Sequence, residues 1–103
     1  MDTYAIENLP ATVALFIYGG DDFYCEITLP QNITGDTFEA VIHTSDGDVS
    51  ITVTVTDAPN GRLNLTLTDT QTSAAEGIAT DWLFRWTHSG ITRTLMAGTC
   101  LVK

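Results

Sequence analysis

Basic residues are scarce in this sequence of 103 residues. Four lysine and arginine side chains stand against thirteen aspartates and glutamates, giving a formal net charge of −9 and a sequence isoelectric point near 4.1. Nucleic-acid backbones and anionic lipid headgroups are bound through clustered Lys and Arg side chains. Nucleic acid and membranes are therefore not expected partners. The acidic excess predicts a solvated surface that a basic patch on another protein can attract.

Cysteine is also rare, and no targeting segment is recognisable. Cys25 and Cys100 are the only cysteines, which is too few for a disulfide scaffold. We expect buried thiols, with a bridge between neighbouring strands as the alternative under oxidising conditions. No signal peptide opens the sequence, and no stretch approaches the roughly 18 apolar residues of a membrane helix. These features predict synthesis in the cytoplasm, and the Asn-x-Thr sequons at Asn32 and Asn64 then occur by chance.

The sequence does contain enough apolar residues for one core. Hydrophobic residues make up 44% of the chain, and nine residues are aromatic. A chain of this length is typical of a single domain, and it buries about 60–70% of the surface that it exposes when unfolded. We predict one domain over residues 1–103, with residues 1–11 as an extended N-terminal arm.

A period of two residues is clearest in the middle of the chain. Between Asp48 and Thr56, valine and isoleucine alternate with serine and threonine, which indicates a strand with one dry face and one wet face. After the segment Asp57-Ala58-Pro59-Asn60-Gly61, the pattern returns over residues 63–68, where leucine alternates with asparagine and threonine. Pro and Asn-Gly suit a tight reversal. The two segments are predicted to form a hairpin.

Five further segments have the length and composition of strands. They span residues 12–18, 23–29, 37–44, 81–88 and 91–102. Gly98 inside the last segment suggests a bulge or a bend. A short helical turn is expected within residues 71–80, because alanine and glutamate precede a natural stop at Gly77. Seven short strands without a long helix predict an all-β fold, an immunoglobulin-like antiparallel sandwich.

The residue types that carry catalysis are sparse. His43 and His88 each lie alone in a predicted strand near a turn, which is typical of surface histidines rather than metal ligands. An apolar strand around Cys25 keeps its thiol protonated and unreactive. The sequence contains no phosphate-binding glycine loop and no nucleophile elbow. We therefore expect no enzymatic activity and no cofactor.

Acidic turns are the only candidate metal sites. Asp21-Asp22, Asp46 with Asp48, and Asp57 carry carboxylates that could collect a calcium ion, but their spacing matches no EF-hand loop. Aspartate next to glycine is also a preferred residue of hairpin turns. Turn formation is the better interpretation, and no metal site is predicted.

The aromatic residues of segment 81–88 allow two interpretations. Trp82, Phe84 and Trp86 share one face of the predicted strand. Large aromatic side chains usually fill the core of a small sandwich, so a core stripe is the first interpretation. The alternative is a platform for carbohydrate, which requires the rings to be exposed.

Four motifs in a fixed order resemble a group of small tailed-phage proteins. They are Gly20–Phe23, Ile33–Ala40, the turn Asp57–Gly61 with the strand after it, and Arg93–Thr99. Together they are similar to the N-terminal immunoglobulin-like domain of phage baseplate upper proteins and to short virion proteins built on it. The resemblance covers the chain from about Val13 to its C-terminus.

The resemblance implies a structural part of a tailed-phage virion. In that family the domain is a scaffold that docks receptor-binding proteins or fibres to the tail, without catalytic residues or cofactor. We therefore expect a tail, baseplate or fibre-adaptor protein, localised in the virion, with other virion proteins as partners and several copies per particle. The chain departs from the family by stopping after the domain, which favours a separate adaptor, neck or decoration subunit. A capsid decoration protein is the structural alternative.

An uncharged surface is the candidate interaction site. The outward positions of the two central strands carry hydroxyl and amide side chains in a chain rich in acids, whereas exposed strands usually carry charges that block association. We predict that this surface, or the strand edge beside it, contacts another subunit, and that the apolar segment 6–18 also reaches a neighbour. The predicted surface consists of Ser50, Thr52, Thr54, Thr56, Asn64, Thr66 and Thr68.

Overall fold

The computed structural model describes residues 2–5 and 11–103, and their side chains from residue 12 onward. Most of the predicted arm over residues 1–11, and the first part of the segment 6–18, lie outside the described residues. The described residues form nine strands and one α-helix. These are β1 (Asp2–Ala5), β2 (Ala11–Thr12), β3 (Leu15–Ile17), β4 (Phe23–Thr28), β5 (Thr37–Thr44), β6 (Gly47–Asp57), β7 (Arg62–Leu67), α1 (Asp69–Ala75), β8 (Ala79–His88) and β9 (Ile91–Val102).

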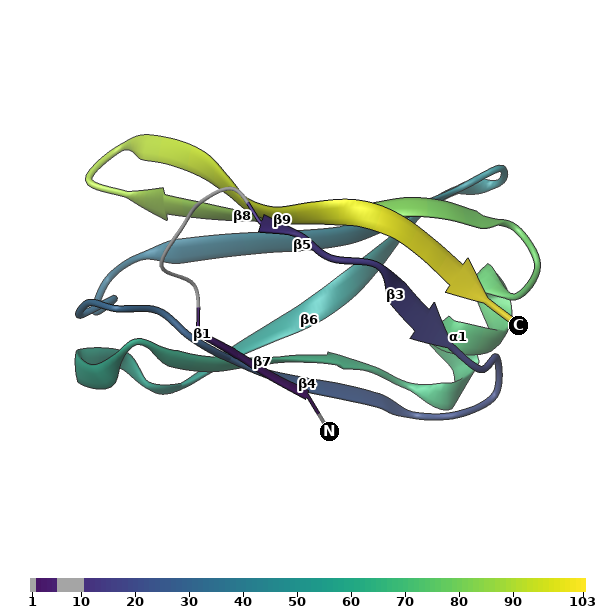
Figure 1. The fold of residues 1–103 in the computed structure, drawn as a ribbon, viewed down its shortest axis with the longest axis horizontal. Coiled ribbons are helices and arrows are strands. Elements are labelled where there is room, and N and C mark those ends of the chain that lie inside the picture. Colours follow the sequence, from purple (N-terminus) through teal and green to yellow (C-terminus); the bar gives the residue numbers. More distant parts are fainter. Residues whose placement is uncertain (1, 6–10) are drawn as a thin grey trace.

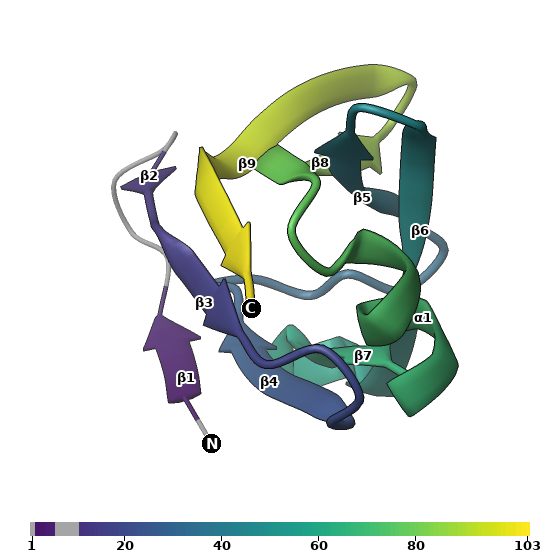
Figure 2. The same cartoon turned by 90° about the vertical axis from the view of Figure 1, so that its right-hand side faces the viewer.

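Two layers of strands face each other across one core. The strand order is β1-β4-β7-β6-β5-β8-β9-β2, and β3 also pairs with β9. Strand β6 belongs to both layers, because Gly47–Ile51 pairs with β5 and Thr52–Asp57 pairs with β7. Figure 1 shows β6 crossing between the layers, and Figure 2 shows β9, β8 and β5 opposite β4 and β7. The predicted all-β, sandwich-like fold is confirmed.

The strands of the N-terminal segment pair in parallel, which differs from the expected antiparallel arrangement. Strand β1 runs parallel to β4, and β2 and β3 run parallel to β9. All pairs among β4 to β9 are antiparallel. The single strand predicted over residues 12–18 is therefore two short strands, interrupted at Val13 and Ala14.

The interruption has a local cause at Val13. The backbone N–H of Val13 donates to the carbonyl of Ala97 at 3.0 Å, and its own carbonyl accepts a hydrogen bond from the indole Nε1 of Trp82 at 2.7 Å. This indole is buried in the core, and a buried N–H left without an acceptor would be costly. The chain at Val13 therefore turns toward Trp82.

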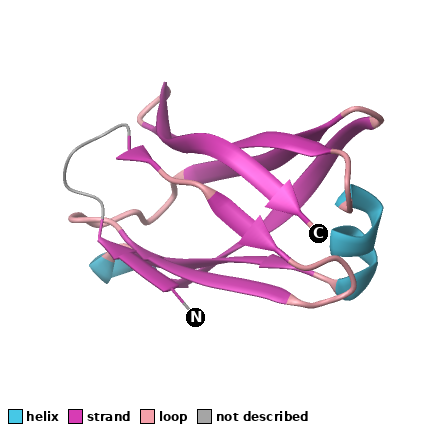
Figure 3. Ribbon diagram, turned by 45° about the vertical axis from the view of Figure 1, so that its right-hand side comes forward, coloured by secondary structure: helices cyan, strands magenta, loops and turns pink. Residues whose placement is uncertain are grey.

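The helix begins two residues before the predicted turn and ends as expected. Thr68 and Gln71 form a capping box at its N-terminus, with the Gln71 backbone N–H donating to Thr68 Oγ1 at 3.2 Å. Gly77 follows the helix at φ +74°, a conformation that favours glycine. Figure 3 shows the helix in cyan at one end of the strands. No helix within the described residues is long and apolar enough to cross a membrane.

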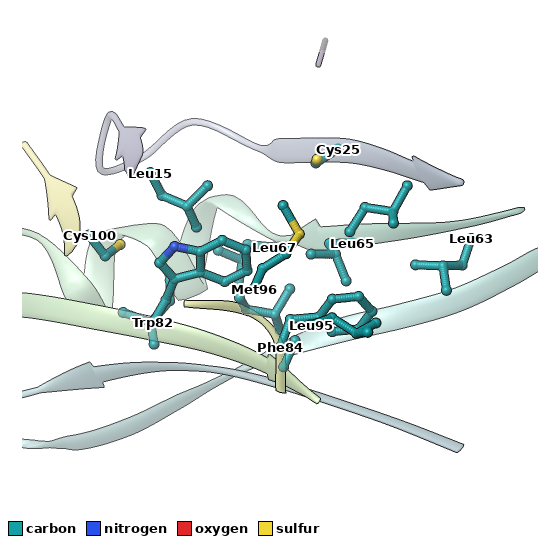
Figure 4. Packing of buried hydrophobic residues seen from close by; sticks show 14 of the residues in the cluster. Leu15, Cys25, Leu63, Leu65, Leu67, Trp82, Phe84, Leu95, Met96 and Cys100 are labelled. Atoms are coloured by element: carbon teal, nitrogen blue, oxygen red, sulfur yellow. The ribbon is translucent and has the colours of Figure 1, made fainter. Parts of the chain in front are cut away.

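The core takes its largest side chains from β8. Trp82, Phe84 and Trp86 are all buried, so the interpretation of this stripe as core is confirmed. Leucines of β7 close the core from the opposite layer, as Figure 4 shows for Leu63, Leu65 and Leu67. The alternation in the sequence therefore assigned the inward faces of β7 and β8 correctly.

Gly98 is a point of close approach rather than a bulge. The irregularity in the β8–β9 ladder lies at Leu95, because Met96 pairs with Phe84 while Thr94 pairs with Arg85. A Cβ atom at position 98 would lie 2.3 Å from the Val13 carbonyl oxygen. Glycine at this position lets the N-terminal segment cross β9.

Replacement of Gly98 by alanine should destabilise the domain, because the new methyl group displaces the backbone at Val13 and strains its hydrogen bond to Trp82. We expect Gly98→Ala to lower the free energy of unfolding by about 1–3 kcal/mol in urea denaturation. The matched control is Thr99→Ala, at the exposed neighbouring position on the same strand. Equal stability of the two variants would contradict the close approach.

Candidate interaction surfaces

Four residues of the predicted surface lie together on one outer face. Thr52 pairs with Thr66, and Thr54 pairs with Asn64, across strands β6 and β7. Thr52, Thr54 and Thr56 are exposed, whereas Thr66 is half-buried. We call the surface formed by Thr52, Thr54, Thr56 and Thr66 the threonine face.

The other residues of the predicted surface have different surroundings. Ser50 is exposed, but it pairs with Val41 of β5 in the other layer. Thr68 is exposed, and its hydroxyl caps helix α1. Asn64 points outward as predicted but is only 8% exposed. The structure therefore brings together the threonines of β6 and β7 and separates Ser50 and Thr68 from them.

Asn64 is buried beside the side chain of Tyr24. Its Nδ2 donates to Tyr24 Oη at 3.3 Å, and Tyr24 Oη donates to Glu26 Oε1 at 3.2 Å. Because the Tyr24 hydroxyl reaches Glu26, two positions further along β4, the Tyr24 ring lies along the strand. Asn64 Oδ1 is the only buried side-chain N or O atom in the described part of the chain that lacks a hydrogen-bond partner.

A second exposed surface lies on β3 and the end of β9. Phe16, Tyr18 and Leu101 are 53%, 57% and 45% exposed, and Phe16 pairs with Leu101. The two rings meet edge to face, with centroids 5.3 Å apart, and Lys103 Nζ lies 5.9 Å from the centroid of the Phe16 ring. We call these four residues the aromatic ribbon. Their contiguous exposure makes the ribbon a candidate interaction site.

The strand that carries the ribbon lacks the usual protection of a sheet edge. Among the described strands, β3 pairs with β9 alone (Figure 1). Residues 11–20 contain no charged residue and no proline, and residues 98–103 contain no acidic residue. Charges, prolines and bulges are the features that commonly block pairing at an edge. Phe16 and Tyr18 lie within the described part of the segment 6–18 for which sequence predicted a contact, whereas Leu101 and Lys103 lie outside that segment. None of these four residues was singled out from the sequence.

His43 has a surface role. Its Nδ1 lies 3.2 Å from Asp81 Oδ1, and its Nε2 lies 3.9 Å from Asp48 Oδ1. A hydrogen bond from Thr80, followed by one from His43, lowers the pKa of Asp81. No group of three or more His, Cys, Asp or Glu side chains is arranged to hold a metal ion within residues 2–5 and 11–103.

His88, whose side chain is half-exposed, belongs to a hydrogen-bond cluster around the buried carboxylate of Asp36 that sequence reasoning missed. The carboxylate of Asp36 is 6% exposed, and it accepts hydrogen bonds from Trp86 Nε1 and His88 Nδ1, both at 2.7 Å. The cluster ties the loop before β5 to the end of β8. Its polar groups satisfy one another, which indicates a structural role for His88.

The tryptophans do not form a carbohydrate platform. Trp82 and Trp86 are buried, and their indole N–H groups bond to the Val13 carbonyl and the Asp36 carboxylate. Sugar stacking on these rings requires them to be exposed, and they are not.

The two cysteines are buried and are not bridged to each other. Cys25 lies on β4 and Cys100 on β9, strands that are not neighbours in the sheet, and Figure 4 shows the two sulfur atoms apart in the core. Burial, with a smaller contribution from the charge of Asp81, raises the pKa of Cys100 from 9.0 to about 11. The Cys100 thiol is therefore protonated at neutral pH.

Asp36→Ala should destabilise the domain, because it leaves the buried indole N–H of Trp86 without an acceptor. We expect a loss of about 1–3 kcal/mol in the free energy of unfolding, measured by urea denaturation at neutral pH. Asp46→Ala, at an exposed turn, removes the same charge and should change stability little. A similar loss in both variants would refute the structural role of the cluster.

The raised pKa of Cys100 predicts a pH dependence of stability. Between pH 9.0 and about 11 the unfolded chain releases the thiol proton before the folded chain does, so the free energy of unfolding falls as pH rises. Cys100→Val removes this titration, and its stability should fall less than that of the wild type over the same interval. Parallel pH profiles for the two proteins would contradict the burial of the thiol.

Comparison with known proteins finds similarity among solved structures. No protein-family model and no curated protein matches the chain. Among solved structures, the chain is similar to the N-terminal domain of phage TP901-1 ORF48, with a TM-score of 0.51 and 14% sequence identity. The alignment covers 100% of this chain and 99% of that one. At this identity the similarity concerns the fold, and the chain shares its fold with a domain of a phage protein.

Proposed function

We propose that the protein is a non-enzymatic structural component of a tailed-phage virion, placed in the tail or baseplate or acting as a fibre adaptor. The observation that carries this proposal is the fold shared over the whole chain with the N-terminal domain of phage TP901-1 ORF48. The order of the four sequence motifs supports the same function. In this proposal the chain acts through contacts with other virion proteins.

The aromatic ribbon is the proposed assembly contact. It offers three large exposed side chains, Phe16, Tyr18 and Leu101, and its one charged member is Lys103, whereas the chain as a whole has a net charge of −9. Covering apolar surface contributes roughly 25 cal/mol per Å², and an uncharged strand edge places no repulsion against an incoming subunit. The threonine face is the second proposed contact, and it is hydrogen-bonding rather than apolar.

The location in the particle can be tested directly. Mass spectrometry of purified particles should detect the protein, and cryo-microscopy should place it at the tail. Density on the head would instead support a capsid decoration protein. Detection in infected-cell lysate combined with absence from purified particles would refute a virion role.

Charges on the aromatic ribbon should block assembly without unfolding the domain. The double substitution Phe16→Glu and Tyr18→Glu is expected to lower the amount of protein in purified particles about tenfold or more, because a buried unpaired carboxylate is costly at an interface. Ile91→Glu is the matched control, since Ile91 is 60% exposed and lies outside the ribbon. Circular dichroism verifies folding of each variant.

Normal incorporation of the folded double variant would exclude the ribbon as the contact. Thr54→Glu in the same assay examines the threonine face separately. A loss with Thr54→Glu alone would assign the assembly contact to that face.

A further inference from the structure

A hollow lies beside the threonine face, on the same layer of the sandwich. Its volume is about 360 Å³, which falls in the range of small-molecule sites. It sits where β6 bulges, because Asp57 and not Thr56 continues the pairing with β7. The hollow is lined by Glu26, Ile27, Thr28, Thr56, Arg62 and Leu63.

Tyr24 extends this hollow along strand β4. Its ring lies along the strand, is 42% exposed, and is held at its hydroxyl by Asn64 and Glu26. From Tyr24 to Thr28 the strand rises about 13 Å. A fixed aromatic surface and a polar hollow therefore follow one another over a length that suits more than one pyranose ring.

The polar groups of the hollow can both donate and accept hydrogen bonds. Arg62 supplies only donors, Glu26 only acceptors, and the hydroxyls of Thr28 and Thr56 supply both. No ion pair joins Glu26 to Arg62 among the ion pairs of the described residues. Glu26 Oε1 accepts the hydrogen bond from Tyr24 Oη, so the second carboxylate oxygen of Glu26 and the guanidinium of Arg62 remain for a ligand. Their opposite charges cancel, and the site as a whole attracts neither anions nor cations.

We propose that Tyr24 and this hollow bind a neutral oligosaccharide. The apolar C–H face of one sugar ring stacks on Tyr24, because aromatic rings offer rigid apolar area. Hydroxyl groups of the next ring bond to Glu26, Arg62 and the two threonines. The net charge of −9 disfavours acidic saccharides at long range. This inference does not depend on the proposed virion function, and it assigns a sugar site to different residues from the buried tryptophans.

The site can be tested by NMR titration of the purified ¹⁵N-labelled protein. The probes are cellopentaose, maltopentaose and chitopentaose, with a galacturonic acid pentamer as the anionic comparison. We expect at least one neutral probe to shift the amide signals of Tyr24, Glu26 and Arg62 with saturation. The anionic probe should bind more weakly.

Two substitutions locate the binding. Tyr24→Ala should weaken the affinity for the bound probe about tenfold or more, and Phe16→Ala, which removes another exposed aromatic ring, should leave it unchanged. Glu26→Gln provides a second variant with little change in shape, and it should weaken binding even if Tyr24→Ala fails to fold.

Three results would overturn the proposal. These are the absence of saturable shifts with all three neutral probes, shifts that map away from Tyr24 and the hollow, and full affinity in both folded site variants. Absence of the protein from purified virions, which is tested separately, would count against the proposed function. It would not affect the proposal of a sugar site.

Discussion

The contact between Val13, Gly98 and Trp82 holds the N-terminal segment in place. The Val13 carbonyl accepts the buried indole N–H of Trp82, and only the missing side chain of Gly98 lets that carbonyl come so close. Because this contact fixes Val13 on β9, the following residues continue as β3 parallel to the end of β9. The outward positions of β3 then fall to Phe16, with Leu101 beside it. The position of the aromatic ribbon thus follows from the hydrogen bond between the buried indole of Trp82 and the Val13 carbonyl.

The shared strand β6 has a comparable effect on the opposite side of the molecule. Its first half completes one layer and its second half the other, so the outward threonines of the second half join those of β7. The same layer contains Tyr24 and the hollow. One layer therefore offers a polar, hydrogen-bonding surface, whereas β3 and the end of β9 offer an apolar one. The two surfaces suit different kinds of partner.

Features that depend on local pattern could be predicted from the sequence. The alternation in β7 assigned Leu63 and Leu65 to the core, and Gly77 marked the end of the helix region. Features that depend on contacts between distant residues could not. The hydrogen bond between Asn64 and Tyr24 joins residues forty positions apart. The hydrogen bonds of Asp36 reach Trp86 and His88, which are fifty and fifty-two positions away. The parallel pairing of β3 could not be predicted from the sequence either, because a period of two residues does not show the direction of the neighbouring strand.

The pairing of β3 with β9 also bears on how the chain folds during synthesis. Ile17 lies opposite Val102, and the N–H of Lys103 donates to the carbonyl of Ile17 at 2.9 Å. Contacts between such distant positions close a long loop, which is entropically unfavourable and slows folding. Strand β3 therefore has no partner until residues 100–102 have left the ribosome. Until then its apolar residues are open to other nascent chains, because unpaired apolar strands in incompletely folded chains promote association.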